Sequence, residues 1–189
     1  MKLRQARNEL DALRLTLDTM RNAADVGLYR RAWQEFVDRL EKVWSKLKLE
    51  VGDCRIVSIC QQINRAASLR KTDALLQYLG QARHADQHTL QVATMYGLGI
   101  SITLPPGTDL AIDFAKGTAS AKGGDVKLEI GKPQYRLLPI KNRGVTFHPP
   151  SIHLGQVLLG EDPIQVAELG FAFYEDLVRS LEVSLEASG

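Results

Sequence analysis

The residues best suited to acid–base and phosphate chemistry are concentrated in one segment of the chain, residues 75–90. This segment contains Arg83, His84, Asp86 and His88, so it holds two of the four histidines. Histidine titrates near neutral pH, and the guanidinium group of arginine matches the geometry of a phosphate. His84 and His88 are four residues apart, which places them on one face of a helix. These residues therefore allow two interpretations, a metal site and a site for phosphate chemistry.

The first interpretation is a metal site, because two histidines at positions i and i+4 of a helix can both bind zinc. A metalloprotease signature would need a glutamate directly after the first histidine, and Ala85 stands there. A third ligand would have to come from Asp86, His148, His153 or a distant acid. Asp86 lies roughly 160° around the helix from both histidines. We therefore expect no metal site and no cofactor.

The second interpretation rests on the spacing Arg83-x4-His88, which resembles the motif of the HEPN superfamily. Members of this superfamily are helical bundles in which a histidine follows an arginine after four to six residues, with a polar residue directly after the arginine. Here His84 occupies the polar position, and the preceding residues 75–82 have a helical pattern. The resemblance covers roughly residues 1–95 and 160–187, whereas the strand-rich middle departs from the family's pattern.

In active members of that superfamily, the motifs of two protomers meet at a dimer interface and cleave RNA without a metal, through attack by the ribose 2′-hydroxyl. The resemblance therefore implies a homodimer that binds RNA, or acts as a metal-independent endoribonuclease, at the dimer cleft. It also implies that His88 is the general acid or base and that Arg83 stabilises the charge of the phosphorane. His84 would assist as the polar residue.

Helical geometry sets a condition on this interpretation. At 100° per residue, Arg83 and His88 lie about 140° apart around a straight helix. They can face one cleft only if the helix bends or if a second protomer supplies half of the site. The structural alternative is that Asp86 pairs with Arg83 or another base, with His84 and His88 on the outer face. In the alternative function, the chain is a non-catalytic protein-interaction or assembly module that uses the same helices as a docking surface.

Basic residues recur in the middle of the chain and could follow a nucleic-acid backbone. The candidates for this contact are Lys127, Lys132, Arg136, Lys141 and Arg143. Lysines also protect the exposed edges of sheets, so the distribution has a structural explanation as well. Arg143 also begins a second Arg-x4-His sequence, which ends at His148 in a region expected to be strand and loop.

The charge of the chain is nearly balanced, with 24 Lys and Arg against 22 Asp and Glu, but it is unevenly distributed. Residues 1–96 and 97–148 have an excess of bases, whereas residues 149–189 contain seven acids and a single base, Arg179. In one interpretation the acidic segment packs against the basic remainder and neutralises part of it. In the other, it faces away from a basic surface that attracts phosphate.

Apolar residues at alternating spacings of three and four predict amphipathic helices in the first half of the chain. Their expected ranges are 3–24, 32–47, 56–67 and 72–95. Gly27 is expected to end the first helix, and Cys60 is expected to pack in the core. A last helix should begin at Asp162-Pro163, because aspartate is a favoured N-cap and proline suits the first helical turn.

From Gly97 onwards the apolar period changes from about 3.6 to 2, which indicates strands. The alternating runs are 100–104, 110–114, 126–130, 135–140 and 145–147, with turns or loops expected at 105–107, 116–124 and 131–133. The connections are too short for crossover helices, so the strands are expected to be antiparallel.

These patterns predict an α+β protein, mainly a bundle of about five helices, with a small antiparallel sheet inserted between the fourth and last helices. The expected parts of this single domain are a bundle at 1–96, a β-rich insertion at 97–150, and a C-terminal helix at 151–189 that returns to the bundle. The chain has no run of about 18 apolar residues and no secretory signal at its start. We therefore expect a cytoplasmic protein without a membrane span, with RNA as a possible partner.

Overall fold

The computed structural model describes residues 3–52, 56–89, 94–103, 109–113, 118–122, 127–158 and 162–188, with side chains described in 3–52, 56–85, 135–158 and 162–188. These residues form five helices and four pairs of strands. The prediction of a mainly helical α+β protein with a small sheet before the last helix is confirmed. The chain divides into two compact units, residues 1–95 with 136–189, and residues 96–135.

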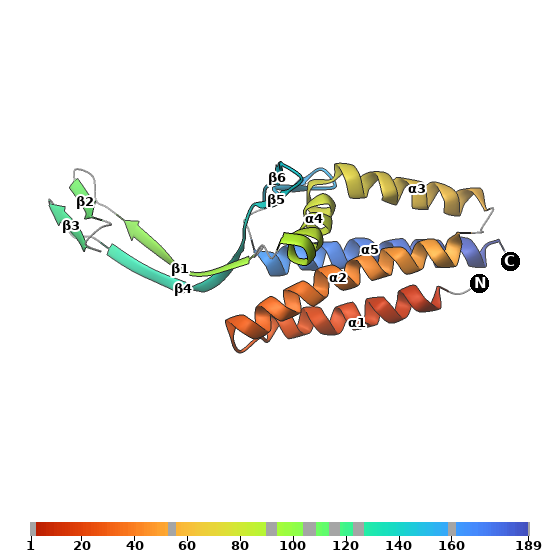
Figure 1. Ribbon diagram of the computed structural model, residues 1–189, viewed down its shortest axis with the longest axis horizontal. Coiled ribbons are helices and arrows are strands. Elements are labelled where there is room, and N and C mark those ends of the chain that lie inside the picture. Colours follow the sequence, from red (N-terminus) through yellow and green to blue (C-terminus); the bar gives the residue numbers. More distant parts are fainter. Residues whose placement is uncertain are drawn as a thin grey trace. The chain divides into compact units, whose positions relative to one another are not determined.

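The first unit contains the five helices, α1 Arg4–Arg21, α2 Val26–Val51, α3 Val57–Thr72, α4 Ala74–Thr89 and α5 Pro163–Glu186. Helix α1 packs along both α2 and α5, and α2 also contacts α4 and α5 (Figure 1). Helix α3 contacts α4 and α5. The last helix therefore returns to the bundle that the N-terminal helices form.

The apolar stripes read from the sequence form the core of this bundle. On α2, all seven residues that define the stripe are buried: Ala32, Trp33, Phe36, Leu40, Val43, Trp44 and Leu47. Removing apolar surface from water, at roughly 25 cal/mol per Å², is the main force that holds such helices together. The prediction for Cys60 was wrong, because Cys60 is exposed and α3 buries Ile59 and Ala66 instead.

Two helix boundaries differ from the prediction. Helix α1 ends at Arg21, and Gly27 lies in the first turn of α2 rather than ending a helix. The N-cap of α2 is Asp25, whose carboxylate accepts a hydrogen bond from the backbone N–H of Leu28 at 2.7 Å. A side-chain cap at this position satisfies a free N–H of the first turn and so starts the helix before the glycine. Helix α4 ends at Thr89, and the expected end near Met95 falls in a strand.

The start predicted for the last helix is confirmed, and the fourth helix starts at Ala74, two residues later than predicted. Thr72 is the last residue of α3, and Asp73 precedes α4 and accepts a hydrogen bond from Leu76 N–H at 3.0 Å. At the start of α5, the carboxylate of Asp162 accepts from Ile164 N–H at 2.9 Å. Pro163 is the first residue of that helix, where its missing N–H costs no hydrogen bond.

The second unit is built from two strand pairs. β1 Thr94–Thr103 pairs with β4 Lys127–Leu137, and β2 Asp109–Asp113 pairs antiparallel with β3 Thr118–Lys122, with Asp109 opposite Lys122. The loop expected at 116–124 contains β3, and the turn expected at 131–133 lies within β4. Gly131 and Pro133 do not interrupt β4, so the turn predicted from these residue types was wrong.

Two further hairpins, β5 Ile140–Asn142 with β6 Val145–Phe147 and β7 Ile152–His153 with β8 Gln156–Val157, lie in the first unit. The β5–β6 hairpin lies within residues 97–150, the expected insertion, and the β7–β8 hairpin lies just after it. The hydroxyl of Tyr78 on α4 donates to the carbonyl oxygen of Leu138 at 2.7 Å, and Ile140 is fully buried. Hydrogen bonding and burial therefore join β5 to the helical bundle.

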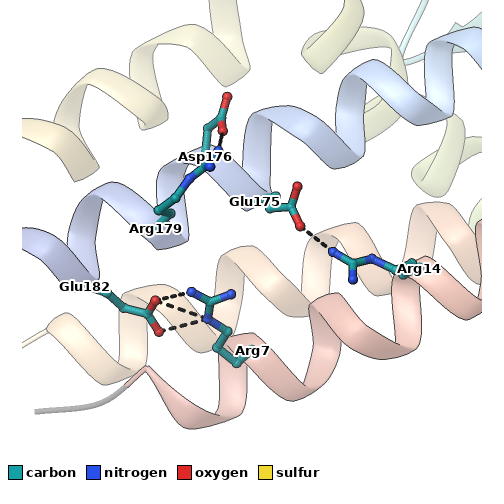
Figure 2. Close-up of polar contacts among 6 residues, drawn as sticks. All are labelled: Arg7, Arg14, Glu175, Asp176, Arg179 and Glu182. Atoms are coloured by element: carbon teal, nitrogen blue, oxygen red, sulfur yellow. Dashed lines mark hydrogen bonds and ion pairs between the residues drawn. The ribbon is translucent and has the colours of Figure 1, made fainter.

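A ladder of three ion pairs joins α1 to α5. Arg7 pairs with Glu182, Arg14 with Glu175 at 2.5 Å, and Arg21 with Glu168 at 2.7 Å; Figure 2 shows the first two pairs. The partners recur every seven residues on both helices, and they run in opposite directions along the chain. Seven residues are close to two helical turns, so each repeat returns to the same face. The interpretation that the acidic C-terminal segment packs against the basic N-terminal part is confirmed.

We expect the triple change Arg7→Glu, Arg14→Glu and Arg21→Glu to lower the free energy of unfolding by about 1–3 kcal/mol, because exposed pairs contribute about 0.2–1 kcal/mol each and like charges then repel. Adding Glu168→Arg, Glu175→Arg and Glu182→Arg should restore most of the loss. Urea unfolding at low and at 1 M salt measures both effects, and salt should reduce them.

The control is the reversal of Asp176 and Arg179, an exposed ion pair whose two members both lie on α5 (Figure 2). Its effect should be at most a few tenths of a kcal/mol. A six-fold variant no more stable than the triple variant would show that the ladder does not stabilise the α1–α5 packing.

Candidate functional site

Arg83 is held against the bundle by a carboxylate that the sequence did not indicate. Its Nε donates a hydrogen bond to Oδ1 of Asp38 on α2 at 3.1 Å. The side chains of Arg83 and Asp38 are 27% and 38% exposed, so the pair lies at the surface between α2 and α4. The expected alternative partner, Asp86, lies outside the described side chains. The bond fixes the guanidinium at its Nε edge and leaves its terminal nitrogens available for a phosphate.

Arg83 and Asp38 line a surface hollow of about 280 Å³ between α2 and α4. Its other lining residues are Glu41, Lys42, Ser45, Lys46 and Leu49. Both carboxylates in this set have arginine partners, since Asp38 pairs with Arg83 and Glu41 pairs with Arg70. Lys42 and Lys46 have no ion pair among the residues that the structure describes. The hollow therefore carries an excess of positive charge, which favours an anion.

The two histidines of the motif follow Arg83 along α4. His84 is exposed, and His88 lies in the last turn of α4 with its side chain outside the described part. α4 is α-helical from Ala74 to Thr89, so the positions of Arg83 and His88 lie about 140° apart around its axis.

The five basic residues predicted to contact nucleic acid are divided between the two units. Arg136, Lys141 and Arg143 belong to the first unit and are exposed there. Lys127 and Lys132 lie in β4 within the second unit, and their side chains are outside the described part. Arg143 stands in the turn between β5 and β6 with a positive φ of 48°, followed by Gly144 at 81°. Such a two-residue turn matches the twist of a tight hairpin.

His153 does not join the other histidines but forms a buried pair with Asp73. His153 Nδ1 lies 2.9 Å from Asp73 Oδ1, and their side chains are 8% and 5% exposed. The other oxygen of Asp73 accepts from Leu154 N–H at 2.7 Å. Burial would raise the pKa of Asp73, but the hydrogen bonds from Leu154, His153 and Leu76 outweigh it and lower this pKa. Nothing in the local sequence around residue 73 indicates this pair, whose members are 80 residues apart.

A partly buried group centres on Arg70 of α3. Arg70 donates to Glu41 of α2 at 2.5 Å and to the hydroxyl of Tyr174 on α5, and its guanidinium lies 5.0 Å from the ring centre of Trp44. Burial raises the pKa of Tyr174 to about 12, although the positive charge of Arg70 acts in the opposite direction. This group joins three helices, and its closed set of partners fits a structural role.

Compared with protein-family models, with curated proteins and with solved structures, the chain matches none of them. Among the described residues, no three of the types His, Cys, Asp and Glu gather closely enough to hold a metal ion. No helix within the described ranges has the length and apolar composition needed to cross a membrane. The case for a function therefore depends on the residues themselves.

Proposed function

We propose that two copies of this chain form a HEPN-like cleft that binds RNA and cleaves it without a metal. The observation that carries the proposal is the position of Arg83, fixed by Asp38 at an open hollow that also contains Lys42 and Lys46. Three cations around one opening suit the closely spaced phosphates of an RNA strand. The helical bundle and the position of Arg83-x4-His88 on α4 agree with the resemblance to that superfamily.

In the proposed reaction, the ribose 2′-oxygen attacks the neighbouring phosphorus and the bond from phosphorus to the 5′-oxygen breaks. This leaves a 2′,3′-cyclic phosphate and a free 5′-hydroxyl. One copy of His88 accepts the proton of the 2′-hydroxyl, and the copy from the other protomer donates a proton to the departing 5′-oxygen. Arg83 stabilises the additional negative charge on the phosphorane, and His84 assists as a polar neighbour.

We expect His88→Ala to reduce the cleavage rate of a single-stranded RNA at least about 100-fold, the usual loss when a general acid or base is removed. Arg83→Ala should produce a loss of similar size, and Arg83→Lys should restore part of it, because lysine keeps the charge but not the planar fork. The measurement is the rate of cyclic-phosphate formation in EDTA, which inactivates any contaminating metal-dependent nuclease.

The chain provides a matched control in its second Arg-x4-His sequence. His148 is exposed and lies at the same distance after an arginine, but outside the helices. His148→Ala should therefore cleave at the wild-type rate. Equal rates for wild type and His88→Ala would show that His88 is not catalytic. RNA binding that weakens steeply with salt would then remain as binding without cleavage, and its absence would favour the interaction module.

A further inference from the structure

A larger groove lies on another part of the helical unit, between α3, α5 and the turn that joins β7 to β8. Its volume is about 450 Å³, within the range of roughly 300–1,000 Å³ typical of small-molecule sites. Its apolar lining is formed by Ala66, Leu69, Leu169, Phe173 and Leu177, with the half-exposed Leu154 at the turn. None of these residues belongs to the proposed RNA site. The groove can therefore hold an apolar body independently of Arg83.

One end of the groove is a buried and fixed histidine. His153 lines the groove at 7% exposure, and the ring of Phe173 lies edge-on to it with 6.5 Å between centroids. Asp73 is acceptor-only when ionised, so it orients the ring by accepting from Nδ1–H. Leu154, at a positive φ of 49°, is held by the same carboxylate through its N–H. Leu154 and Gly155 form the same kind of tight two-residue turn as Arg143 and Gly144, and the carboxylate of Asp73 holds this turn in place at the end of the groove.

Among the polar groups that line the groove, α3 contributes Gln62 and Arg65. Gln62 Nε2 donates to Ser184 Oγ at 2.8 Å, and Gln62 Oε1 is buried, so a ligand in the groove does not reach it. Arg65 has no ion pair among the described residues. Asp176, the acid of the lining, already pairs with Arg179. The groove thus combines an apolar lining with one positive charge, that of Arg65, which an anionic group can pair.

The arrangement fits binding and does not form a hydrolytic triad. Ser180 also lines the groove, but it lies seven residues along α5 from Phe173, the residue whose ring contacts His153. Seven residues of helix correspond to about 10 Å along the axis, so Ser180 and Phe173 lie at different levels of α5. Among the described residues, no hydrogen bond joins Ser180 to His153.

We propose that this groove binds a small anionic amphiphile whose apolar chain lies between α3 and α5 and whose anionic group pairs with Arg65. N-decanoylglycine has these two parts, a linear apolar chain and a terminal carboxylate.

Isothermal titration of the full chain with N-decanoylglycine tests the proposal. We expect saturable binding at one site per chain, weakened at least tenfold by Arg65→Gln and abolished by Ala172→Trp. Ala172 is an exposed residue of α5 in the lining, so the tryptophan fills the groove and leaves the core intact. Arg30→Gln, at an exposed arginine of α2 outside the groove, should bind like wild type.

The role of the charge is tested by changing the ligand rather than the protein. The methyl ester of N-decanoylglycine carries no negative charge, so wild type should bind it at least tenfold more weakly than N-decanoylglycine. Arg65→Gln should bind both compounds about equally. The proposal is overturned if wild type does not bind N-decanoylglycine, or if Arg65→Gln and Ala172→Trp bind it as wild type does. Circular dichroism confirms that each variant is folded.

Discussion

Replacing Asp73 by alanine is expected to lower the free energy of unfolding by about 3–5 kcal/mol, because it leaves three hydrogen-bond donors unpaired, each at a cost of about 1–3 kcal/mol. Asp73 receives hydrogen bonds from Leu76 N–H at the start of α4, from Leu154 N–H in the β7–β8 turn, and from His153. Alanine leaves all three donors without this partner in a place that water scarcely reaches. It also removes the N-cap of α4 and the support of a residue at positive φ.

Urea unfolding followed by far-UV circular dichroism measures the loss, and two further variants show its origin. Asp73→Asn keeps the shape and one acceptor oxygen, so it should lose less than alanine. His153→Gln removes the ring but retains the backbone bonds to Asp73, so it should also lose less. Losses below about 1 kcal/mol for Asp73→Ala would show that the pair does not anchor the turn.

The dependence of this stability on pH has a definite sign. The pKa of Asp73 is lowered in the folded protein, so the carboxylate binds its proton less readily there than in the unfolded chain. Its contribution is therefore fully present above the unfolded pKa, near 4, and is lost as pH falls through the lower folded pKa. Wild type should lose stability over that range more steeply than Asp73→Asn, in which this titration is absent.

Much of the fold follows from local patterns in the sequence. The seven apolar residues of α2 recur at helical spacing and are all buried, and Asp162-Pro163 marks the start of α5 by its own chemistry. The boundaries that were wrong depend on competition between neighbouring signals. Gly27 suggests the end of a helix, but Asp25 two residues earlier caps the next one. Apolar periodicity does not show which of two neighbouring residues, a helix-ending glycine or a helix-capping aspartate, determines the boundary.

The candidate sites depend on contacts between residues far apart in the chain. Arg83 was chosen for its type and spacing, but Asp38, which fixes it, is 45 residues earlier. His153 was weighed as a metal ligand, whereas the structure pairs it with Asp73. The α1–α5 ladder is different, because bases at 7, 14 and 21 and acids at 168, 175 and 182 share a period that can be read directly. Counting the charges of each segment shows that one is basic and the other acidic. Only the common spacing of seven residues shows which bases and acids can pair.

Replacing Arg70 by alanine is expected to lower the free energy of unfolding by about 2–4 kcal/mol. The guanidinium joins Glu41, Tyr174 and the ring of Trp44, and its loss leaves Glu41 without its pair and the Tyr174 hydroxyl without its donor. The Arg70 and Glu41 side chains are 19% and 27% exposed, more than those of Asp73 and His153, so the expected loss is smaller. Urea unfolding followed by tryptophan fluorescence measures it, because Trp44 is in the cluster. Arg70→Lys should recover part of the loss, and a loss equal to that of alanine would show that the charge contributes little.

Alkaline pH distinguishes the electrostatic part of this cluster from its packing. The pKa of Tyr174 is raised to about 12 in the folded protein, against about 10 in an unfolded chain. The folded state therefore keeps a proton that the unfolded state has lost, and stability falls as pH rises from about 10 to about 12. Tyr174→Phe should lack this part of the decline. Arg70→Ala removes the charge that favours the phenolate, so its decline should continue to higher pH than that of wild type. If wild type and Tyr174→Phe lose stability in parallel above pH 10, the hydroxyl of Tyr174 is not buried in the way the structure shows.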